Sequence, residues 1–209
     1  MPTPHLVSLP LECGPVRLRD WQLSDLDAYA HWMHPKNDWH KLDGPYYPKP
    51  SPEAIPAMVS RQRTEIERTA WPMPREQLVI ADRESDALLG MVSWYWIGEE
   101  TNWLAQGIVI YDPTYWRRGI GTVAFGLWGQ YLFDAMPHIV RLDLRTWSGN
   151  LGMQSLARRL GYAEEARFRM ARIVDGDYYD GLGFGILRGE WFALYPHSFA
   201  AHYNAPRNG

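Results

Sequence analysis

The sequence has almost no cysteine, no long apolar run and, in its second half, no lysine. Cys13 is the one cysteine among 209 residues, so an internal disulfide is excluded, and no group of cysteines and histidines has the spacing of a zinc site. No apolar run approaches the ~20 residues that a membrane-spanning helix needs, and residues 1–10 lack the basic start and apolar middle of a signal peptide. We therefore predict a metal-free protein in a reducing, cytoplasmic setting, without a membrane partner.

The charged residues divide unevenly along the chain. Residues 1–116 carry 10 Lys and Arg against 16 Asp and Glu, whereas residues 117–209 carry 11 Arg against 8 Asp and Glu. One interpretation is chance scatter over solvated faces. The other is that the second half binds an anionic ligand while the first half favours a cationic one. Nucleic acid is disfavoured as a partner, because no basic run and no aromatic–basic repeat occurs.

The composition and length are those of one globular domain, with 46% apolar and 22% charged residues. We expect this domain to cover residues 1–209, with residues 1–15 and 192–209 as peripheral tails. The patterning predicts strands at 16–19, 77–81, 88–96, 102–111, 140–147, 164–174 and 178–187, and helices at 24–33, from 51 to before 71, 121–133 and 150–160. Residues 34–52, rich in Pro, Gly, Asp and aromatics, are expected to form a long ordered loop or lid.

The most informative segment is Ile108–Thr122, which reads IVIYDPTYWRRGIGT. A β-rich run meets a turn and two arginines, and Gly119 and Gly121 then open a helical pattern. The first N–H groups of a helix lack partners and lie at the positive end of its dipole, so a loop of this kind binds phosphate. A tight structural turn is the alternative. The strand before, the helix after and the adjacent arginines favour an anion site.

Two separate motifs resemble the GNAT superfamily of acyl-CoA-dependent N-acetyltransferases. Trp116–Gly121 fits the family's loop pattern, Gln/Arg-x-x-Gly-x-Gly/Ala, except at its first position. Tyr115–Trp116, Ser148–Asn150 and Arg159–Ala166 resemble the branch that includes ribosomal-protein alanine and polyamine acetyltransferases. The resemblance extends from residue 16 to about residue 191.

The resemblance implies an α/β fold of the α+β type, with a mixed, mostly antiparallel sheet that is flanked by helices and splays open after its fourth strand. Acetyl-CoA would be the co-substrate, with its pantetheine arm in that gap. Backbone groups that would pair with the arm belong to Val109, Ile110 and Tyr111. Amides that would hold the pyrophosphate belong to Arg117, Arg118, Gly119, Ile120, Gly121 and Thr122.

Three further residues on the predicted helix at 150–160 are implied to bind the cofactor. Asn150 matches a family position that faces the cofactor; the alternative is a helix N-cap, and both roles can hold together. Gln154 and Arg158, on one face of the helix, are expected to reach the adenosine side.

The implied reaction is transfer of an acetyl group to a primary amine by direct attack in a ternary complex. An amine with a pKa of about 10.4 is almost entirely protonated at pH 7, so its deprotonation represents roughly 4–5 kcal/mol of the barrier. At the position of the family's usual glutamate base this chain has Gln106. At the position of the usual tyrosine acid it has Ala157, and at that of a serine alternative it has Met153. We therefore leave the catalytic residue unassigned. An acyl-CoA-binding regulator with little or no catalysis is the alternative function.

The acceptor, a small molecule or a peptide amine, is left open, as is a homodimer. A base from the loops, at His34, Asp43, Glu99 or Glu100, is the alternative to proton transfer through bulk water. A carboxylate beside tyrosines would suit a cation. The uneven distribution of charged residues along the chain likewise predicts a cationic acceptor. The residues expected to meet the acceptor are His34, Asp43, Tyr46, Tyr47, Trp94 and Gln106.

Overall fold

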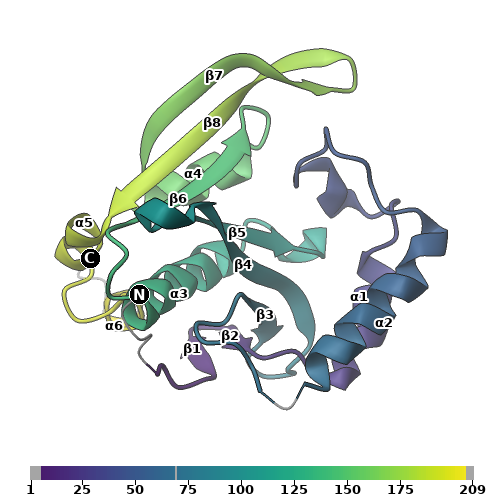
Figure 1. Ribbon diagram of the computed structural model, residues 1–209, viewed down its shortest axis with the longest axis horizontal. Coiled ribbons are helices and arrows are strands. Elements are labelled where there is room, and N and C mark those ends of the chain that lie inside the picture. The colour runs from purple at the N-terminus through teal and green to yellow at the C-terminus, as the bar shows by residue number, and fades with distance from the viewer. Residues whose placement is uncertain (1–5, 69, 206–209) are drawn as a thin grey trace.

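The sheet at the centre of this protein is mixed and mostly antiparallel, as predicted. The computed structural model describes residues 6–68 and 70–205, and within them eight strands form one sheet in the order β1-β2-β3-β4-β5-β6-β8-β7 (Figure 1). β5 and β6 run parallel, and every other neighbouring pair is antiparallel. The strands are β1 (Leu11–Cys13), β2 (Val16–Arg19), β3 (Gln77–Asp82), β4 (Leu88–Gly98), β5 (Trp103–Ile110), β6 (Arg141–Trp147), β7 (Ala163–Val174) and β8 (Asp177–Leu187).

Helices cover both faces of this sheet. The α-helices are α1 (Leu26–Trp32), α2 (Ile55–Ile66), α3 (Ile120–Ala135), α4 (Leu151–Arg159), α5 (Arg188–Leu194) and α6 (Phe199–Asn204). Short 3₁₀ turns lie at Leu23–Asp25, Asp38–Lys41, Pro52–Ala54, Glu99–Thr101 and Pro113–Tyr115. Among the described residues, every helix is too short or too polar to cross a membrane.

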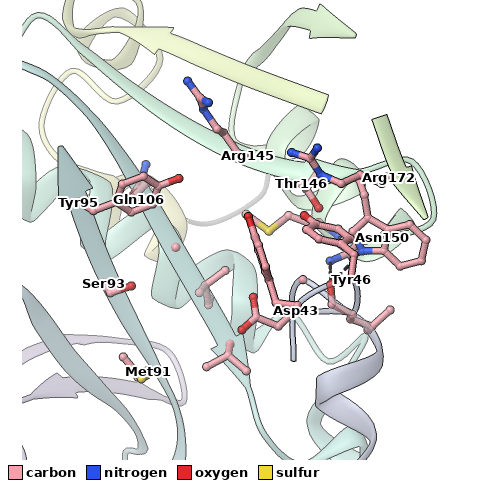
Figure 2. A pocket seen from close by; sticks show the side chains of 18 residues that line it. Asp43, Tyr46, Met91, Ser93, Tyr95, Gln106, Arg145, Thr146, Asn150 and Arg172 are labelled. Carbon is pink, nitrogen blue, oxygen red and sulfur yellow. Dashed lines mark hydrogen bonds between the residues drawn. The ribbon is translucent and has the colours of Figure 1, made fainter. Parts of the chain in front are cut away.

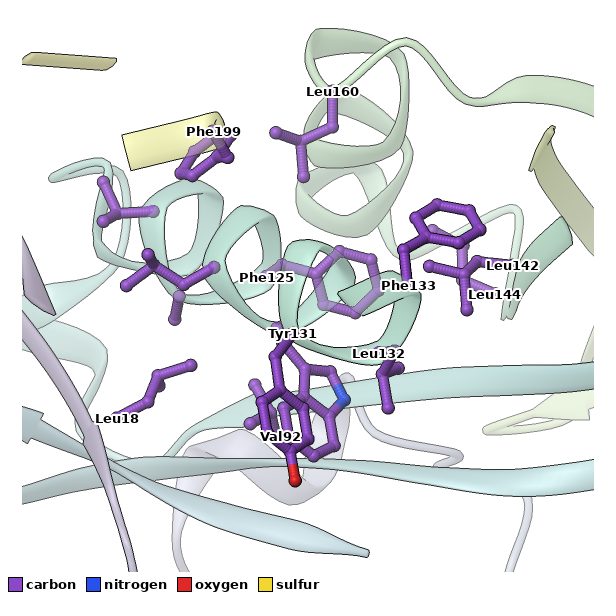
Figure 3. Packing of buried hydrophobic residues seen from close by; sticks show 14 of the residues in the cluster. Leu18, Val92, Phe125, Tyr131, Leu132, Phe133, Leu142, Leu144, Leu160 and Phe199 are labelled. Atoms are coloured by element: carbon purple, nitrogen blue, oxygen red, sulfur yellow. The ribbon is translucent and has the colours of Figure 1, made fainter. Parts of the chain in front are cut away.

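The two faces of the sheet have separate cores because side chains alternate along a strand. On β3, Leu78 and Ile80 pack in the larger cluster with α3, whereas Val79 and Ala81 pack in the cluster beneath α1 and α2. α3 is apolar almost all round and correspondingly buried, as expected for a helix covered on most sides. Figure 3 shows its aromatic and leucine side chains between the strands below and Leu160 and Phe199 above.

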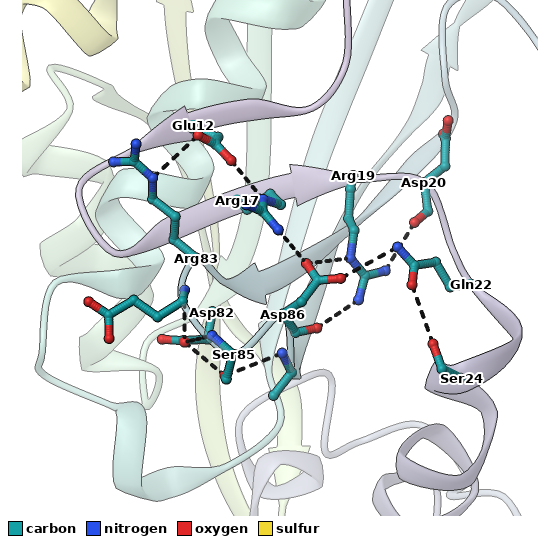
Figure 4. Close-up of polar contacts among 12 residues, drawn as sticks. Glu12, Arg17, Arg19, Asp20, Gln22, Ser24, Asp82, Arg83, Ser85 and Asp86 are labelled. Atoms are coloured by element: carbon teal, nitrogen blue, oxygen red, sulfur yellow. Dashed lines mark hydrogen bonds and ion pairs between the residues drawn. The ribbon is translucent and has the colours of Figure 1, made fainter.

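A buried ion pair fixes the start of α1 against the sheet. The guanidinium of Arg19 donates to both carboxylate oxygens of Asp25 at 2.8 Å, and a second carboxylate, that of Asp86, accepts from Arg19 Nε at 3.1 Å (Figure 4). Asp25 also accepts from the backbone N–H of Gln22 at 2.9 Å. Bidentate pairing of this kind satisfies a buried charge and sets the orientation of the helix.

Both terminal segments contribute more than peripheral tails would. β1 pairs with β2, which buries Cys13, and Phe199 of α6 is buried against α3. The ring of Phe199 occupies the space beside Gly126, where a Cβ would lie 2.2 Å from Phe199 Cζ. These elements are three and six residues long, too short to show a recognisable period in the sequence.

The sheet splays between β5 and β6, as the resemblance implied. Only Leu104↔Leu142 and Ala105↔Asp143 pair across these strands, and the strands diverge beyond that point. Because β1 precedes the first predicted strand, the opening follows the fifth strand rather than the fourth.

We expect Phe199→Ala to lower the free energy of unfolding by about 3–5 kcal/mol, since it removes a buried ring from the closely packed space beside Gly126. Urea denaturation measures this loss. Phe168→Ala is the matched control, because Phe168 on β7 is 58% exposed and its removal should change stability by no more than about 0.5 kcal/mol. Equal effects of the two substitutions would contradict the assignment of α6 to the core.

Candidate functional site

A cavity of about 480 Å³ opens where β5 and β6 diverge (Figure 2). It is closed on one side by the loop after α1 and at one end by β7 and the start of α4. The lining residues are Leu42, Asp43, Gly44, Tyr46, Tyr47, Met91, Ser93, Tyr95, Gln106, Gly107, Ile108, Val109, Arg145, Thr146, Trp147, Asn150, Met153 and Arg172. Of the six residues predicted to meet the acceptor, four line this cavity: Asp43, Tyr46, Tyr47 and Gln106.

The alternation of β4 decides which of its residues reach the cavity. Met91, Ser93 and Tyr95 line it, so Trp94 faces the other side of the sheet. The indole N–H of Trp94 donates to Arg75 O at 2.8 Å, and its ring packs edge-on against Trp96. The prediction that Trp94 lines the acceptor pocket is therefore wrong. Aromatic content alone did not reveal which face of the strand the cavity would use.

The other expected loop residues also lie elsewhere. His34 follows α1 and accepts from the backbone N–H of Lys36 at 3.4 Å, and it does not line the cavity. Glu99 and Glu100 form the 3₁₀ turn that joins β4 to β5, away from the lining residues. None of these three is placed to act as a base in this cavity.

Two hydrogen bonds to one carbonyl hold the loop over the cavity. Leu42 O accepts from the indole Nε1 of Trp147 at 3.1 Å and from Asn150 Nδ2 at 3.2 Å. Asn150 Oδ1 in turn accepts from the N–H of Met153 at 3.0 Å, so Asn150 caps α4 as the alternative interpretation held. One side chain therefore caps a helix and positions the segment that carries Asp43.

Asp43 and Gln106 lie on opposite sides of the cavity (Figure 2). Asp43 is the one carboxylate among the described lining residues, and although it is exposed, partial desolvation by the surrounding protein raises the pKa of its carboxyl. Gln106 is only 2% exposed, and its Nε2 donates to the hydroxyl of Tyr162. Burial raises the pKa of Tyr162 well above 10, so this hydroxyl stays protonated and neutral. In the described part of the chain Gln106 Oε1 has no partner.

Two arginines in the cavity wall were not predicted. The guanidinium of Arg172 on β7 lies over the ring of Tyr46, with its Cζ 4.9 Å from the ring centroid, and Arg145 on β6 lies 5.8 Å from the ring of Trp103. Arg172 thus occupies one face of Tyr46, where we expected an acceptor ammonium. Tyr47 is 67% exposed, so most of its surface faces solvent. Arginines on alternating polar strands indicate a solvated face, so the sequence offered no signal for them.

The hydrogen bonding of β5 restricts which backbone groups face the gap. The N–H of Tyr111 donates to Leu89 O at 2.9 Å, and by alternation Val109 also turns its polar groups toward β4. Ile110, and likewise Ile108, face the opening, although Ile110 O accepts from the indole of Trp116 at 3.0 Å. The prediction that three consecutive residues pair with a ligand arm is wrong for Val109 and Tyr111.

The glycine loop has the geometry expected of an anion site. Arg117 and Gly119 adopt positive φ, +61° and +84°, and a Cβ on Gly119 would meet nothing within 4 Å. The first intrahelical bond of α3 runs from Val123 N–H to Gly119 O at 3.1 Å, which leaves the amides of Ile120–Thr122 without helical partners. They point outward at the positive end of a 16-residue helix.

A second cavity, of about 560 Å³, adjoins this loop. Its walls are Arg117, Arg118, Gly119, Thr122, Arg159, Leu160, Tyr195, Phe199, His202, Tyr203 and Ala205, so the C-terminal helices form one side. The resemblance indicated Gln154 and Arg158 for the adenosine side of the cofactor, and neither lines this cavity. Gln154 is buried and donates to Ser148 O at 2.8 Å, while Arg158 pairs with Glu164 at 3.3 Å. The next residue, Arg159, lies one helical step further round and faces the loop.

The pKa shift of Asp43 predicts a pH-dependent gain in stability on substitution. A carboxyl whose pKa is raised by folding binds its proton more tightly in the folded state, so its ionisation opposes folding as the pH rises through the folded pKa. We expect Asp43→Asn to have a larger free energy of unfolding than the parent at pH 7, with a difference that shrinks as the pH falls toward 4. Urea denaturation at both pH values measures this. A less stable variant at pH 7 would show that a partner compensates the carboxylate.

Comparison with known proteins gives one family and one fold. The acetyltransferase (GNAT) domain model matches residues 16–163, and a comparison with curated proteins found no match. Solved structures with the same fold include a GNAT acetyltransferase of Bacillus anthracis, at 16% identity and a TM-score of 0.68 over 87% of this chain and all of that one. A GCN5-related N-acetyltransferase of Brucella melitensis has 20% identity and a TM-score of 0.68, with 99% and 90% of the chains covered. The spermidine N-acetyltransferase of Vibrio cholerae, solved with CoA and spermine, has 16% identity and a TM-score of 0.67, with 85% and 98% covered.

Proposed function

Because the chain belongs to the GNAT family of acetyltransferases, we propose that it transfers the acetyl group of acetyl-CoA to a primary amine within a ternary complex. The observation that carries this proposal is that an anion-binding type of loop and an open cavity adjoin the same strand, β5. The free amides at the start of α3 follow the C-terminal end of β5, and the cavity lies along the C-terminal half of the same strand, at residues 106–109, where β6 has diverged. A ligand with an anionic end and a neutral arm fits both.

In this proposal the pyrophosphate of CoA binds the amides of Ile120–Thr122. Charge-assisted bonds to backbone N–H groups contribute about 1.5–3 kcal/mol each, and Arg117, Arg118 and Arg159 supply positive charge around them. The pantetheine arm runs along β5 and pairs with the backbone groups of Ile108 and Ile110 that face the gap. Asn150 would contact the arm with the side of its amide that lines the cavity.

The reaction proceeds by attack of the neutral amine on the thioester carbon. A C–N bond forms, the C–S bond breaks, and the proton lost by nitrogen is transferred to the thiolate of CoA. Gln106 cannot accept a proton, but its Oε1, held in place by Tyr162, is available to accept a hydrogen bond from the attacking N–H and so orient the lone pair. Asp43 is the carboxylate that could take this proton, since its raised pKa makes it more basic than an ordinary aspartate.

The positions where relatives are expected to carry a proton donor hold Ala157, which is buried, and Met153, which lines the cavity. This absence supports the alternative function, an acyl-CoA-binding regulator without catalysis.

We expect the purified protein to release free CoA thiol from acetyl-CoA when a suitable primary amine is added. A thiol-reactive dye measures the release. Tight CoA binding with no amine-dependent release across polyamines, amino acids and peptides would favour the regulator.

The cofactor loop is tested by Gly119→Val. The branched side chain would occupy the open space in which the pyrophosphate binds, so we expect CoA affinity to fall by about tenfold or more, one or two charge-assisted bonds being lost. Isothermal titration calorimetry measures the dissociation constant.

Gly176→Val is the matched control for this substitution. Gly176 also has a positive φ and open space around its missing Cβ, but it lies in the turn between β7 and β8. It should carry the same backbone strain with unchanged CoA affinity. Unchanged affinity in both variants would refute the assignment of the loop.

A further inference from the structure

The cavity between β5 and β6 carries more positive than negative charge. Its described lining residues include two arginines, Arg145 and Arg172, and one carboxylate, Asp43. Two other arginines of these strands are neutralised, since Arg141 pairs with Asp143 and Arg167 pairs with Asp180, whereas the exposed Arg169 has no ion pair among the described residues. In the described part of the chain Arg145 and Arg172 have no such ion pair.

Arg172 is held in one position without being neutralised. Tyr46 covers one face of its guanidinium, and the guanidinium also packs against β8 at Gly181, where a Cβ would lie at van der Waals distance, 3.5 Å, from Arg172 Cζ. Its Nη1 donates to Ala171 O at 2.8 Å, while Nε is buried with no partner among the described residues. A partly buried cation is costly unless an anion compensates it, so this geometry points to an anionic group that is supplied by a ligand.

The cofactor does not account for this charge. In the proposed binding mode the phosphates of CoA lie at the start of α3, where Arg117, Arg118 and Arg159 meet them. The acetyl group and the pantetheine arm that enter the cavity are uncharged. The unpaired arginines therefore face the part of the cavity that is left for the acceptor.

We propose that the acceptor is an amine that also bears a carboxylate, as an amino acid does, and that Arg172 binds this carboxylate. The inference rests on the proposed acetyl transfer and names its substrate class. A planar guanidinium matches a carboxylate better than a point charge does, and Arg145 adds a second positive charge to the same wall. The amine end of the same molecule is left to the other polar groups of the wall, with Gln106 on one side of the cavity and Asp43 on the other.

This inference reverses the acceptor charge that the uneven charge distribution predicts. The acidic first half contributes only Asp43 to the charges of the cavity, whereas Arg145 and Arg172 reach it from the basic second half. The net charge of a segment is a poor guide to a cavity that two segments build together.

The test compares matched acceptors that differ only in the carboxylate. For the parent protein, kcat/KM should be about tenfold or more higher for amino acids than for the corresponding amino acid amides, with spermidine included as a cationic acceptor. Arg172→Gln should lower kcat/KM by about tenfold for the carboxylates, mainly through KM, and by no more than about twofold for the amides. Arg172→Lys should restore part of the preference.

Arg169→Gln is the matched control, because Arg169 lies on the same strand, is exposed and does not line the cavity. It should leave both acceptor classes unchanged. Equal losses on carboxylates and amides in Arg172→Gln would make Arg172 structural and overturn the inference. The comparison of acceptors with the parent protein still decides the matter if that variant fails to fold.

The outcomes separate the inference from the function on which it rests. Turnover of amides or spermidine at least as fast as of amino acids would refute the carboxylate-bearing acceptor and leave acetyl transfer intact. CoA binding without turnover of any acceptor would refute the proposed function itself.

Discussion

The divergence of β5 and β6 is the constraint on which the rest of this structure depends. The two strands pair over only two residues each, and from Gln106 onward β5 has no neighbour on one side. Backbone polar groups left inside a sheet without partners are costly, so the amides of Ile108 and Ile110 favour a ligand that can replace the missing strand. The same divergence opens the cavity and brings Gln106, although it is buried, to the cavity wall.

The cavity depends secondarily on contacts between segments that are far apart in sequence. Leu42 O binds Trp147 and Asn150, more than one hundred positions away, and Arg172 covers Tyr46 from the hairpin of β7 and β8. Each neutral hydrogen bond contributes only about 0.5–1.5 kcal/mol, so the loop is anchored by a few contacts rather than by a large buried surface. Figure 1 shows the loop after α1 and the tip of this hairpin approaching one another across the opening.

Charge is separated between the two cavities in a way that suits two different ligands. The cavity beside α3 combines free amides with Arg117, Arg118 and Arg159 and has no carboxylate among its described lining residues. The cavity between the strands combines two arginines with Asp43 and neutral hydrogen-bonding groups. A polyanionic cofactor end and a zwitterionic acceptor fit these two environments respectively.

The sequence by itself determined the order of the longer elements, the glycine loop at the start of α3 and the cap of α4, because these features depend on local periodicity and on helix ends. It also indicated Gln106, which lines the cavity, because motif spacing locates a position along a strand. What it did not determine is which side of an element faces the site. The position of the gap beside each element decides which of its residues reach a cavity. Side chains that do so are Ser93 and Tyr95 rather than Trp94, and Arg159 rather than Arg158, while the backbone groups facing the gap are those of Ile108 rather than Val109. Arg172 and the C-terminal helices were found only in the tertiary structure, since their roles arise from contacts with residues far away along the chain.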